Sequence, residues 1–507
     1  MQEAHKVVSL DVGTTSFAEK EQEVHIERYD NVADMPDPDE GKSDAERAEI
    51  DRALIRKVDF WLIPWLGLLY LLSFLDRSNV GNARLAGLEK DLNMDGGDYN
   101  TALTVFFVTY ALAEPATNVL LRRLTPRVFF TGIIVSWGLV MTCMGLVHNY
   151  SGLLACRIFL GLAEAGLFPG VNYYLSCWYK RSELGLRAAI FFSAAALAGS
   201  FGGLLAAAIA QMDGVGGKPG WAWIFILEGL ITMVVGGFCW VMVFDWPETA
   251  RFLTPDDQIR MRRRLAADRQ ASNEEQYDKR HFYAALRDWK TWSYAVIYTG
   301  CDCALYAFSL FLPTILRGLG YQGTHAQLLS VPPYAGAAIA TITVGYIADR
   351  TQQRGYCSIV ASSIGIAGFV MLLSTDNPHI QYAGTFLAAI GIYPNIPNSL
   401  SWASNNTEGV YKRGIVIGIA VGVGNISGVV SSNIYLTQQA PRFWTGHGVV
   451  LGSLVVCLFG GTVFTRVMLR IENAKRLSGK RDRMHDGLSA EQIWLMGDKR
   501  PDFIYTL

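Results

Sequence analysis

The chain has 507 residues, of which 51% are apolar and 18% are charged, and its formal net charge is −1. Mean hydropathy is positive, at +0.21, and apolar runs of about 20 residues, the length a helix needs to cross a bilayer, recur along almost the whole chain. These features exclude a string of soluble domains, and the balanced charge gives no support for a nucleic-acid partner. We predict an all-α polytopic protein whose partner is the lipid bilayer.

The N-terminal segment differs from the rest of the chain. Residues 1–52 carry 15 acidic and 6 basic side chains and few aromatic ones. Such a composition predicts a disordered tail, here an acidic cytoplasmic one. The segment has neither a basic n-region nor an apolar h-region, so we expect no cleavable signal peptide, and the first membrane helix would act as the internal signal.

Twelve membrane spans follow this tail. They form two six-helix bundles at 53–244 and 291–470, with a linker at 245–290 and a cytoplasmic tail at 471–507. The predicted spans are 58–78, 99–121, 127–147, 151–175, 187–211, 221–244, 291–315, 327–349, 356–375, 379–403, 413–436 and 446–470.

Loop basicity predicts the orientation, because loops rich in Lys and Arg stay in the cytoplasm. One set of short loops holds ten such residues and the opposite set holds five. The ten are Arg122, Arg123, Arg127, Lys180, Arg181, Arg187, Arg350, Arg354, Lys412 and Arg413. We therefore place these loops, the linker and both termini in the cytoplasm. The plasma membrane is the favoured location, with a vacuolar or other internal membrane as the alternative.

The cytoplasmic linker contains a helix start. Thr254 can act as the N-cap, Pro255 takes the first helical position, and Asp256 and Asp257 lie at the positive end of the helix. The basic run Arg260–Arg264 then follows on a surface helix. We expect this run to be solvated, with contact to anionic lipid as the alternative.

The stretch Arg157–Gly170 places charged residues inside a long apolar run. Arg157, Gly161 and Glu164 fall at i, i+4 and i+7, so they share one helix face about 10 Å long. A central arginine costs roughly 2.5–3.5 kcal/mol on insertion scales and is tolerated where it faces protein or a water-filled cavity. This face is therefore a candidate functional site.

The two halves resemble each other in sequence. Phe168-Pro169, Trp178 and Arg187 in the first half have counterparts in the second, which are Tyr393-Pro394, Trp402 and Arg413 at nearly equal spacing. Two parallel six-helix repeats with a substrate site between them at mid-membrane are typical of one transporter architecture.

That architecture is the major facilitator superfamily, and residues 55–475 resemble it. The segment Gly345–Arg350, followed by Arg354 and Gly355, is similar to the superfamily's cytoplasmic loop signature. The resemblance implies gating roles for Asp349, Arg350 and Arg354. The equivalent loop of the first half, 118–127, lacks the acidic residue of the signature. The resemblance therefore does not predict a gating salt bridge in that loop.

Three motifs narrow the resemblance. Leu75–Ala83, Arg157–Gly170 and Gly220–Gly229 together resemble the anion:cation symporter family, and within it the fungal allantoate, nicotinate and pantothenate permeases. The resemblance implies proton binding at Asp76 and Glu164, coupling of the two by Arg77, and Arg157 nearby. The alternative is a set of structural ion pairs that lock spans one and four together.

Amides and aromatic side chains in the spans could orient a small planar or ureide anion. The candidate substrate-binding residues are Tyr110, Tyr298, Tyr306, Asn395, Asn398, Trp402 and Asn425. Asn395 and Asn398 flank Pro397 and could instead satisfy a broken helix. Three further acids are ambiguous. Glu114 could take part in transport, cap a kink beside Pro115 or bind the loop arginines, and Asp302 could line the cavity or pack helices. Glu228 is expected to form a structural pair near a helix start.

We predict a proton-coupled symporter that moves a small organic anion, with protons as the second partner, by alternating access. Export or exchange of an acidic metabolite, and a non-transporting nutrient sensor, are the alternatives. No phosphate-cradling loop, nucleophile elbow, zinc helix or metal-ligand cysteine spacing occurs in the sequence. We therefore expect neither enzymatic activity nor a cofactor or metal, and nothing requires more than a monomer.

Overall fold

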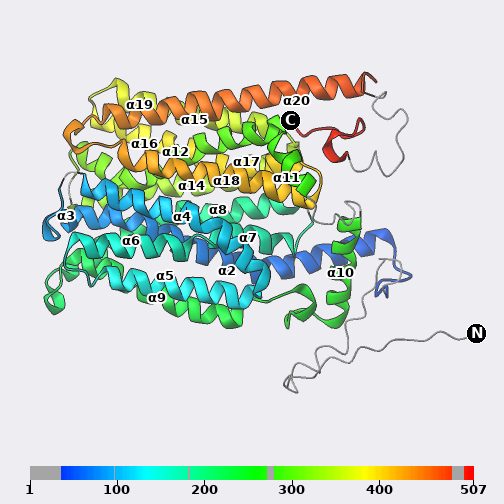
Figure 1. Cartoon of the computed structure of the whole chain (residues 1–507), viewed down its shortest axis with the longest axis horizontal. Helices are drawn as coiled ribbons and strands as arrows, with labels where there is room; N and C mark the ends of the chain where they lie inside the picture. Colours follow the sequence, from blue (N-terminus) through cyan, green and yellow to red (C-terminus); the bar gives the residue numbers. More distant parts are fainter. Residues whose placement is uncertain (1–35, 96, 181–182, 271–278, 322, 482–495) are drawn as a thin grey trace, which may run out of the picture.

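A computed structural model describes residues 36–95, 97–180, 183–270, 279–321, 323–481 and 496–507. All regular elements in these ranges are helices. The long helices run side by side in one bundle, and α10, the start of α2 and the C-terminal segment lie at the same end of it (Figure 1). We call this the linker end and the opposite one, which carries α3, the hairpin end.

The first half of the bundle contains six passes. α2 is one continuous helix whose first four turns are rich in charged residues and whose residues 60–75 are largely apolar. Its polar segment 76–82 is buried against neighbouring helices rather than lipid. The elements of this half are α2 (Asp44–Leu85), α3 (Leu88–Asp91), α4 (Asp98–Arg123), α5 (Pro126–Met144), α6 (Tyr150–Glu164), α7 (Leu167–Ser176), α8 (Leu184–Ile209), η4 (Ala210–Met212), η5 (Val215–Gly217) and α9 (Gly220–Met242).

The linker and the second half repeat this plan. The linker elements are η6 (Pro247–Thr249), α10 (Pro255–Gln270) and α11 (Lys279–Leu286). Those of the second half are α12 (Trp289–Gly318), α13 (Gly323–Leu329), α14 (Val331–Thr351), α15 (Arg354–Ser374), α16 (Pro378–Ile392), α17 (Asn395–Asn405), α18 (Val410–Asn433), η7 (Thr437–Gln439), α19 (Trp444–Gly452), η8 (Ser453–Gly460), α20 (Gly461–Leu477) and η10 (Gly497–Lys499).

The predicted all-α membrane fold of twelve passes is confirmed. Ten helical segments among the described residues are long and apolar enough to cross a membrane. The other two passes are α4, which carries Asp98 and Glu114 as well as two terminal arginines, and α16–α17, which is interrupted at Tyr393-Pro394. Large apolar side chains also point outward from the bundle, as a lipid-facing surface requires.

The fourth and tenth passes are both broken near their middles. α6 ends at Glu164 and α7 begins at Leu167, while α16 ends at Ile392 and α17 begins at Asn395. A proline lies at each break, Pro169 in the first turn of α7 and Pro394 within the second break, and each removes a backbone donor from the helical ladder. The breaks therefore lie at or within a few residues of the segments Phe168-Pro169 and Tyr393-Pro394 that the internal sequence repeat had paired.

Two sequence expectations at the linker end need correction. α2 begins at Asp44, inside the segment predicted to be disordered, because Ser43 and Glu46 form a capping box. The basic run of α10 is neither solvated nor placed on lipid. Arg260 binds Asp39 at 3.0 Å, and Arg264 binds Asp51 at 2.9 Å and also Glu183. The linker helix is thus clamped to the start of the first half.

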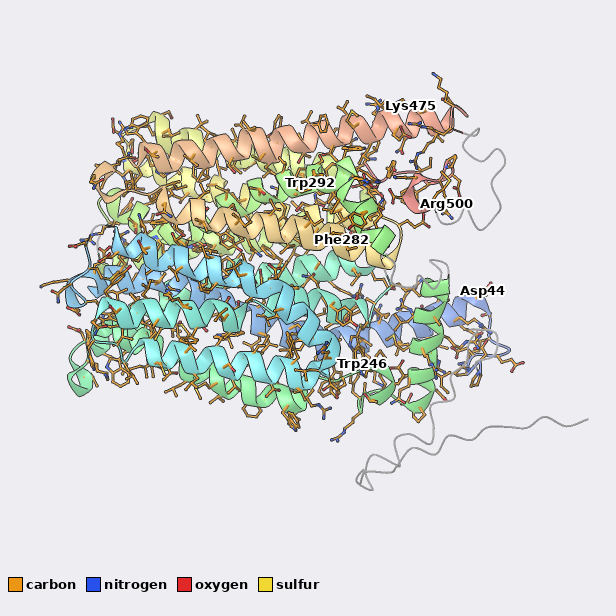
Figure 2. All side chains as sticks on the ribbon, viewed as in Figure 1. Asp44, Trp246, Phe282, Trp292, Lys475 and Arg500 are labelled. Carbon is orange, nitrogen blue, oxygen red and sulfur yellow. The ribbon has the colours of Figure 1, made fainter. Side chains whose placement is uncertain are left out.

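The sequence predicted only a cytoplasmic tail at 471–507, but the described part of this segment makes specific contacts with the bundle. Asp498 is fully buried and binds Lys412 of α18 at 2.7 Å and Lys290 of α12. Trp402 Nε1 donates to the carbonyl of Thr506 at 2.8 Å. Figure 2 shows Arg500 at the linker end, between the bundle and Lys475 at the end of α20. The segment 496–507 therefore ties together helices of the second half.

The two halves meet mainly through α2 with α12, α4 with α18 and α8 with α14, and α8 also contacts α13 and α17. Toward the hairpin end, Ser200 Oγ donates to the Val331 carbonyl at 3.1 Å, and Asn433 Nδ2 donates to Thr104 Oγ1 at 2.8 Å. Toward the linker end, α8 lies so close to α14 that a side chain at Gly185 would overlap Asp349 and Arg354. The halves are thus in contact near both ends of the bundle.

Candidate functional site

A small cavity lies between the halves. Its volume is about 10 Å³, room for about one water molecule. An organic anion therefore does not fit in this conformation, and binding requires the halves to move apart. The lining residues are Tyr70, Phe74, Arg77, Tyr110, Phe168, Phe192, Tyr298, Asp302, Leu305, Tyr306 and Asn425.

The cation of this cavity is Arg77, on the buried polar turn of α2. Its Nη2 atom donates to Glu164 Oε1 of α6 at 2.6 Å, and Ser73 Oγ donates to the same oxygen at 2.6 Å. Glu164 is fully buried, and its second oxygen has no hydrogen-bond partner. Arg77 and Glu164, which the resemblance links in proton coupling and the alternative links as a structural ion pair, are thus in direct contact.

A chain of hydrogen bonds continues from Arg77 into the second half. Arg77 Nη1 donates to Tyr306 Oη at 3.3 Å, and Tyr306 donates to Asn425 Oδ1 at 2.9 Å. Asn425 Nδ2 then donates to Glu114 Oε2 at 2.9 Å. Because the chain crosses the interface twice, movement of the halves must break or rearrange it. Glu114 thus contacts the second half instead of loop arginines.

Aromatic rings surround the Arg77 guanidinium. Its Cζ atom lies 5.0 Å from the ring centroid of Tyr110, 5.3 Å from that of Phe106 and 5.6 Å from that of Tyr306. Ring faces attract a cation without neutralising it. Arg77 is therefore held in place yet keeps its charge for an anion.

Asp76 points away from the cavity, although it is adjacent to Arg77 in the chain. Trp137 Nε1 of α5 donates to Asp76 Oδ2 at 2.6 Å, and Thr232 Oγ1 of α9 donates to the same atom at 3.2 Å. Asp76 Oδ1 has no partner. The expected pairing of Glu228 is wrong, since both of its oxygens are buried without a hydrogen bond. The reason is that Glu228 lies two turns inside α9, among apolar helices.

Arg157 is buried toward the hairpin end, about 10 Å along α6 from Glu164. Its Nε and Nη2 atoms have no hydrogen-bond partner among the described residues. Gly161, between the two on the same face, lets α6 approach α4 closely, since a Cβ there would lie 2.6 Å from the Phe106 carbonyl oxygen. Arg157 thus keeps unused donors in the interior of the first half.

Four of the seven predicted substrate residues, Tyr110, Tyr298, Tyr306 and Asn425, line the cavity. The other three do not. Asn395 donates to the Gly391 carbonyl at 2.6 Å, as the alternative for a broken helix anticipated. Asn398 donates to Ser358 Oγ at 2.8 Å, and Trp402 holds the C-terminal segment. These two belong to the linker end because α17 runs from the break toward that end.

The predicted gating residues behave differently from one another. Arg354 pairs with Asp349, and this pair packs against Gly185 of the first half. Arg350 is exposed and donates to the hydroxyl of Tyr346 on its own helix. The structure thus joins Asp349 and Arg354 at the interface and leaves Arg350 outside it.

Sequence reasoning missed most of the aromatic wall of the cavity. Tyr70, Phe74 and Arg77 fall at i, i+4 and i+7, so the helix period that identified Arg157 and Glu164 would also have found them. Phe168 and Phe192 carried no such signal, because aromatic residues on apolar helices more often face lipid or core. Asp302 lines the cavity with one oxygen unpartnered.

The family profile of the Major Facilitator Superfamily matches residues 66–432. This chain belongs to the major facilitator superfamily. The yeast Saccharomyces cerevisiae high-affinity nicotinic acid transporter is 33% identical over 465 residues, covering 90% of this chain and 85% of that protein. The major facilitator-type transporter hxnP of Emericella nidulans is 31% identical over 494 residues, covering 95% and 99%.

Solved structures agree with this fold. A bacterial homologue of the human lysosomal transporter Spinster, inward-facing and unoccupied, has a TM-score of 0.56 at 16% identity and covers 81% of this chain and 94% of that one. The nucleoside transporter NupG has a TM-score of 0.56 at 10% identity, covering 79% and 99%. As a major facilitator transporter, the protein has its cavity between two six-helix halves, where this architecture places its substrate.

Proposed function

We propose that this transporter is a proton-coupled symporter of a small organic anion, with Arg77 as the anion-binding cation. The observation that carries the proposal is the Arg77–Glu164 pair at the edge of the enclosed cavity. A substrate carboxylate and the Glu164 carboxylate compete for one guanidinium. Protonation of Glu164 removes one competitor, so a proton and an anion favour each other's binding.

The cavity also favours a particular kind of anion. Its wall is largely aromatic, and ring faces suit a flat substrate. Asp302 lies one helical turn from Tyr306 on α12, about 6 Å along the helix, and also lines the cavity, where it offers a second polar group beside Arg77 and Asn425. A planar carboxylate such as nicotinate fits this chemistry, and the name of the yeast relative points in the same direction. Pantothenate and allantoate are the other candidates.

Location and direction follow from the same scheme. The loops at the linker end hold the excess of basic residues, so we place that end and both termini in the cytoplasm of a plasma-membrane protein. Protons then load Glu164 from the acidic outer side and are released inside. The contacts between the halves that we describe lie within one chain, and a monomer suffices for alternating access.

Uptake into proteoliposomes tests this proposal. Purified protein would be given radiolabelled nicotinate, pantothenate, allantoate and simple sugar acids, with and without an inward proton gradient, beside Glu164→Gln and the exposed control Glu248→Gln. We expect gradient-dependent accumulation of one substrate, lost in Glu164→Gln while exchange persists, and unchanged in Glu248→Gln. Accumulation that ignores the gradient and survives Glu164→Gln would refute proton coupling and leave an exchanger or exporter.

A further inference from the structure

Glu228 has no place in the scheme above, yet it is among the most completely buried acids in the described chain. Its relative exposure is 0%, and neither carboxyl oxygen has a hydrogen-bond partner. An ionised carboxylate left alone in such a site costs several kcal/mol even after the protein relaxes. An acid in this setting is stable when it carries its proton.

Asp76 is the acidic neighbour of Glu228. Thr232, whose hydroxyl donates to Asp76 Oδ2 at 3.2 Å, is one helical turn from Glu228 on the same face of α9. Three of the four oxygens of this pair, Asp76 Oδ1 and both from Glu228, lack a partner.

Among the described residues packed around the two acids, we find no cation bound to either one. α5 contributes Trp137, Gly138 and Thr142, none of which is ionisable. The indole N–H of Trp137 already donates to Asp76 Oδ2. On α2 the next residue is Arg77, whose guanidinium binds Glu164 on the other side of the helix. On α8, Arg187 binds Asp59 at the linker end. Two carboxyl groups close together without a cation cannot both be ionised.

We propose that Glu228 and Asp76 form a proton-holding carboxyl pair inside the first half, separate from the cavity. Glu228 keeps its proton and donates through its O–H to the unpartnered Oδ1 of Asp76, while Asp76 is the member that gains and loses a proton. The pair alternates between two protons and one. The proton that leaves Asp76 passes to water on the inner side when the halves open there, and a proton from the outer side replaces it after the halves open outward.

The pair helps Asp76 to release its proton, an effect on coupling that Glu164 alone does not provide. Without Glu228, ionised Asp76 would keep only the two donors on its Oδ2 atom, Trp137 and Thr232, and its Oδ1 atom would have none, so the carboxyl would release its proton less readily. The Glu228 O–H stabilises the ionised form of Asp76, as hydrogen bonds to a carboxylate do. Glu228 is thus a positioning residue for proton release by Asp76. This role rests on the proposed proton coupling, whereas the existence of the pair does not.

Infrared difference spectroscopy tests the pair without any substrate. A protonated carboxyl has a carbonyl stretch separate from those of carboxylates and amides, and labelling with glutamate carrying ¹³C in its side-chain carboxyl assigns the band to glutamate. The full-length protein would be titrated in detergent as wild type, Glu228→Gln and Glu248→Gln. We expect a glutamic-acid band at neutral pH that is lost in Glu228→Gln and retained in Glu248→Gln. A full wild-type band in Glu228→Gln overturns the proposal.

Asp76→Asn provides the second variant, in case Glu228→Gln fails to fold. This change removes the acceptor of the Glu228 proton but leaves the proton in place, so the glutamic-acid band must persist at a shifted frequency. An unshifted band refutes the pairing. In proteoliposomes, Glu228→Gln should keep nicotinate exchange but change the pH profile of gradient-driven uptake. If nicotinate is not moved at all, the proposed substrate is wrong, but the infrared result still decides the pair.

Discussion

Arg77 Nη2 on α2 and Glu164 Oε1 on α6 lie 2.6 Å apart, and both side chains are buried in the membrane-spanning part of the protein. A pair this well buried contributes little net stability compared with apolar packing, but losing one partner leaves an uncompensated charge. Its value to a transporter is that either partner can be exchanged for a ligand. A proton can take the place of Arg77 on Glu164, and an anion can take the place of Glu164 on Arg77.

Arg77→Lys tests the shape of this cation. Lysine keeps the charge but loses the planar fork that bonds a carboxylate through two nitrogens, and it cannot hold Glu164 and Tyr306 together. We expect binding of the transported anion to weaken by about 1.5–3 kcal/mol, roughly 10- to 100-fold in Kd. Binding of a labelled substrate to the purified protein measures the change. Equal affinity in the two proteins would show that Arg77 does not contact the anion.

The hydrogen-bond chain from Arg77 to Glu114 predicts coupling between Tyr306 and Asn425. Tyr306→Phe and Asn425→Ala each remove one link, so the loss from the double variant should be smaller than the sum of the single losses. For residues in one network, we expect an interaction energy of about 0.5–3 kcal/mol in a double-mutant cycle on thermal stability. Strictly additive effects would mean that the two side chains act independently.

Gly185→Leu should disturb the closure of the linker end. A side chain at Gly185 overlaps Asp349 and Arg354, so α8 and α14 can no longer meet there. We expect faster amide hydrogen exchange near the start of α8 and the start of α15, because the population shifts toward a conformation open at this end. Gly132→Ala is the matched control, since its Cβ would meet no atom within 4 Å. Unchanged exchange in Gly185→Leu would contradict this gate.

Asp498→Asn should release the C-terminal segment. Burial alone raises the pKa of the Asp498 carboxyl, but Lys290 and Lys412 outweigh burial, and the pKa lies below its ordinary value. Removing one partner of a buried ion pair costs about 3–5 kcal/mol, and we expect a loss of that order in the second half. Thermal unfolding in detergent measures the loss.

The ion pairs of Asp498 with Lys290 and Lys412 also predict how the stability of the protein depends on pH. Because the folded pKa of Asp498 lies below the unfolded value of about 3.9, the pair contributes its stability above about pH 4 and loses it as pH falls through the folded pKa. Asp498→Asn should therefore be less stable than wild type at neutral pH, and the difference should shrink in acid. A difference that does not vary with pH would assign the effect to packing.

The sequence by itself determined the elements whose signal is local. The length and apolar character of its runs predicted the membrane-spanning helices, and the periodic placement of Arg157 and Glu164 identified a buried face on the fourth pass. The paired Phe168-Pro169 and Tyr393-Pro394 segments indicated the repeat of the two halves. These features could be predicted because hydrophobic length, helical period and proline chemistry act within a few turns of one chain.

Tertiary structure decided which of these residues meet. Asp76 and Arg77 are neighbours in the chain but point to opposite sides of α2, one toward Trp137 and Glu228 and the other toward Glu164 and the cavity. Trp402 repeats Trp178 of the first half and was expected to bind substrate, yet it lies at the linker end and holds the C-terminal segment on α17. A helix period fixes angles along one element, whereas the direction each face takes in the bundle depends on packing among distant segments.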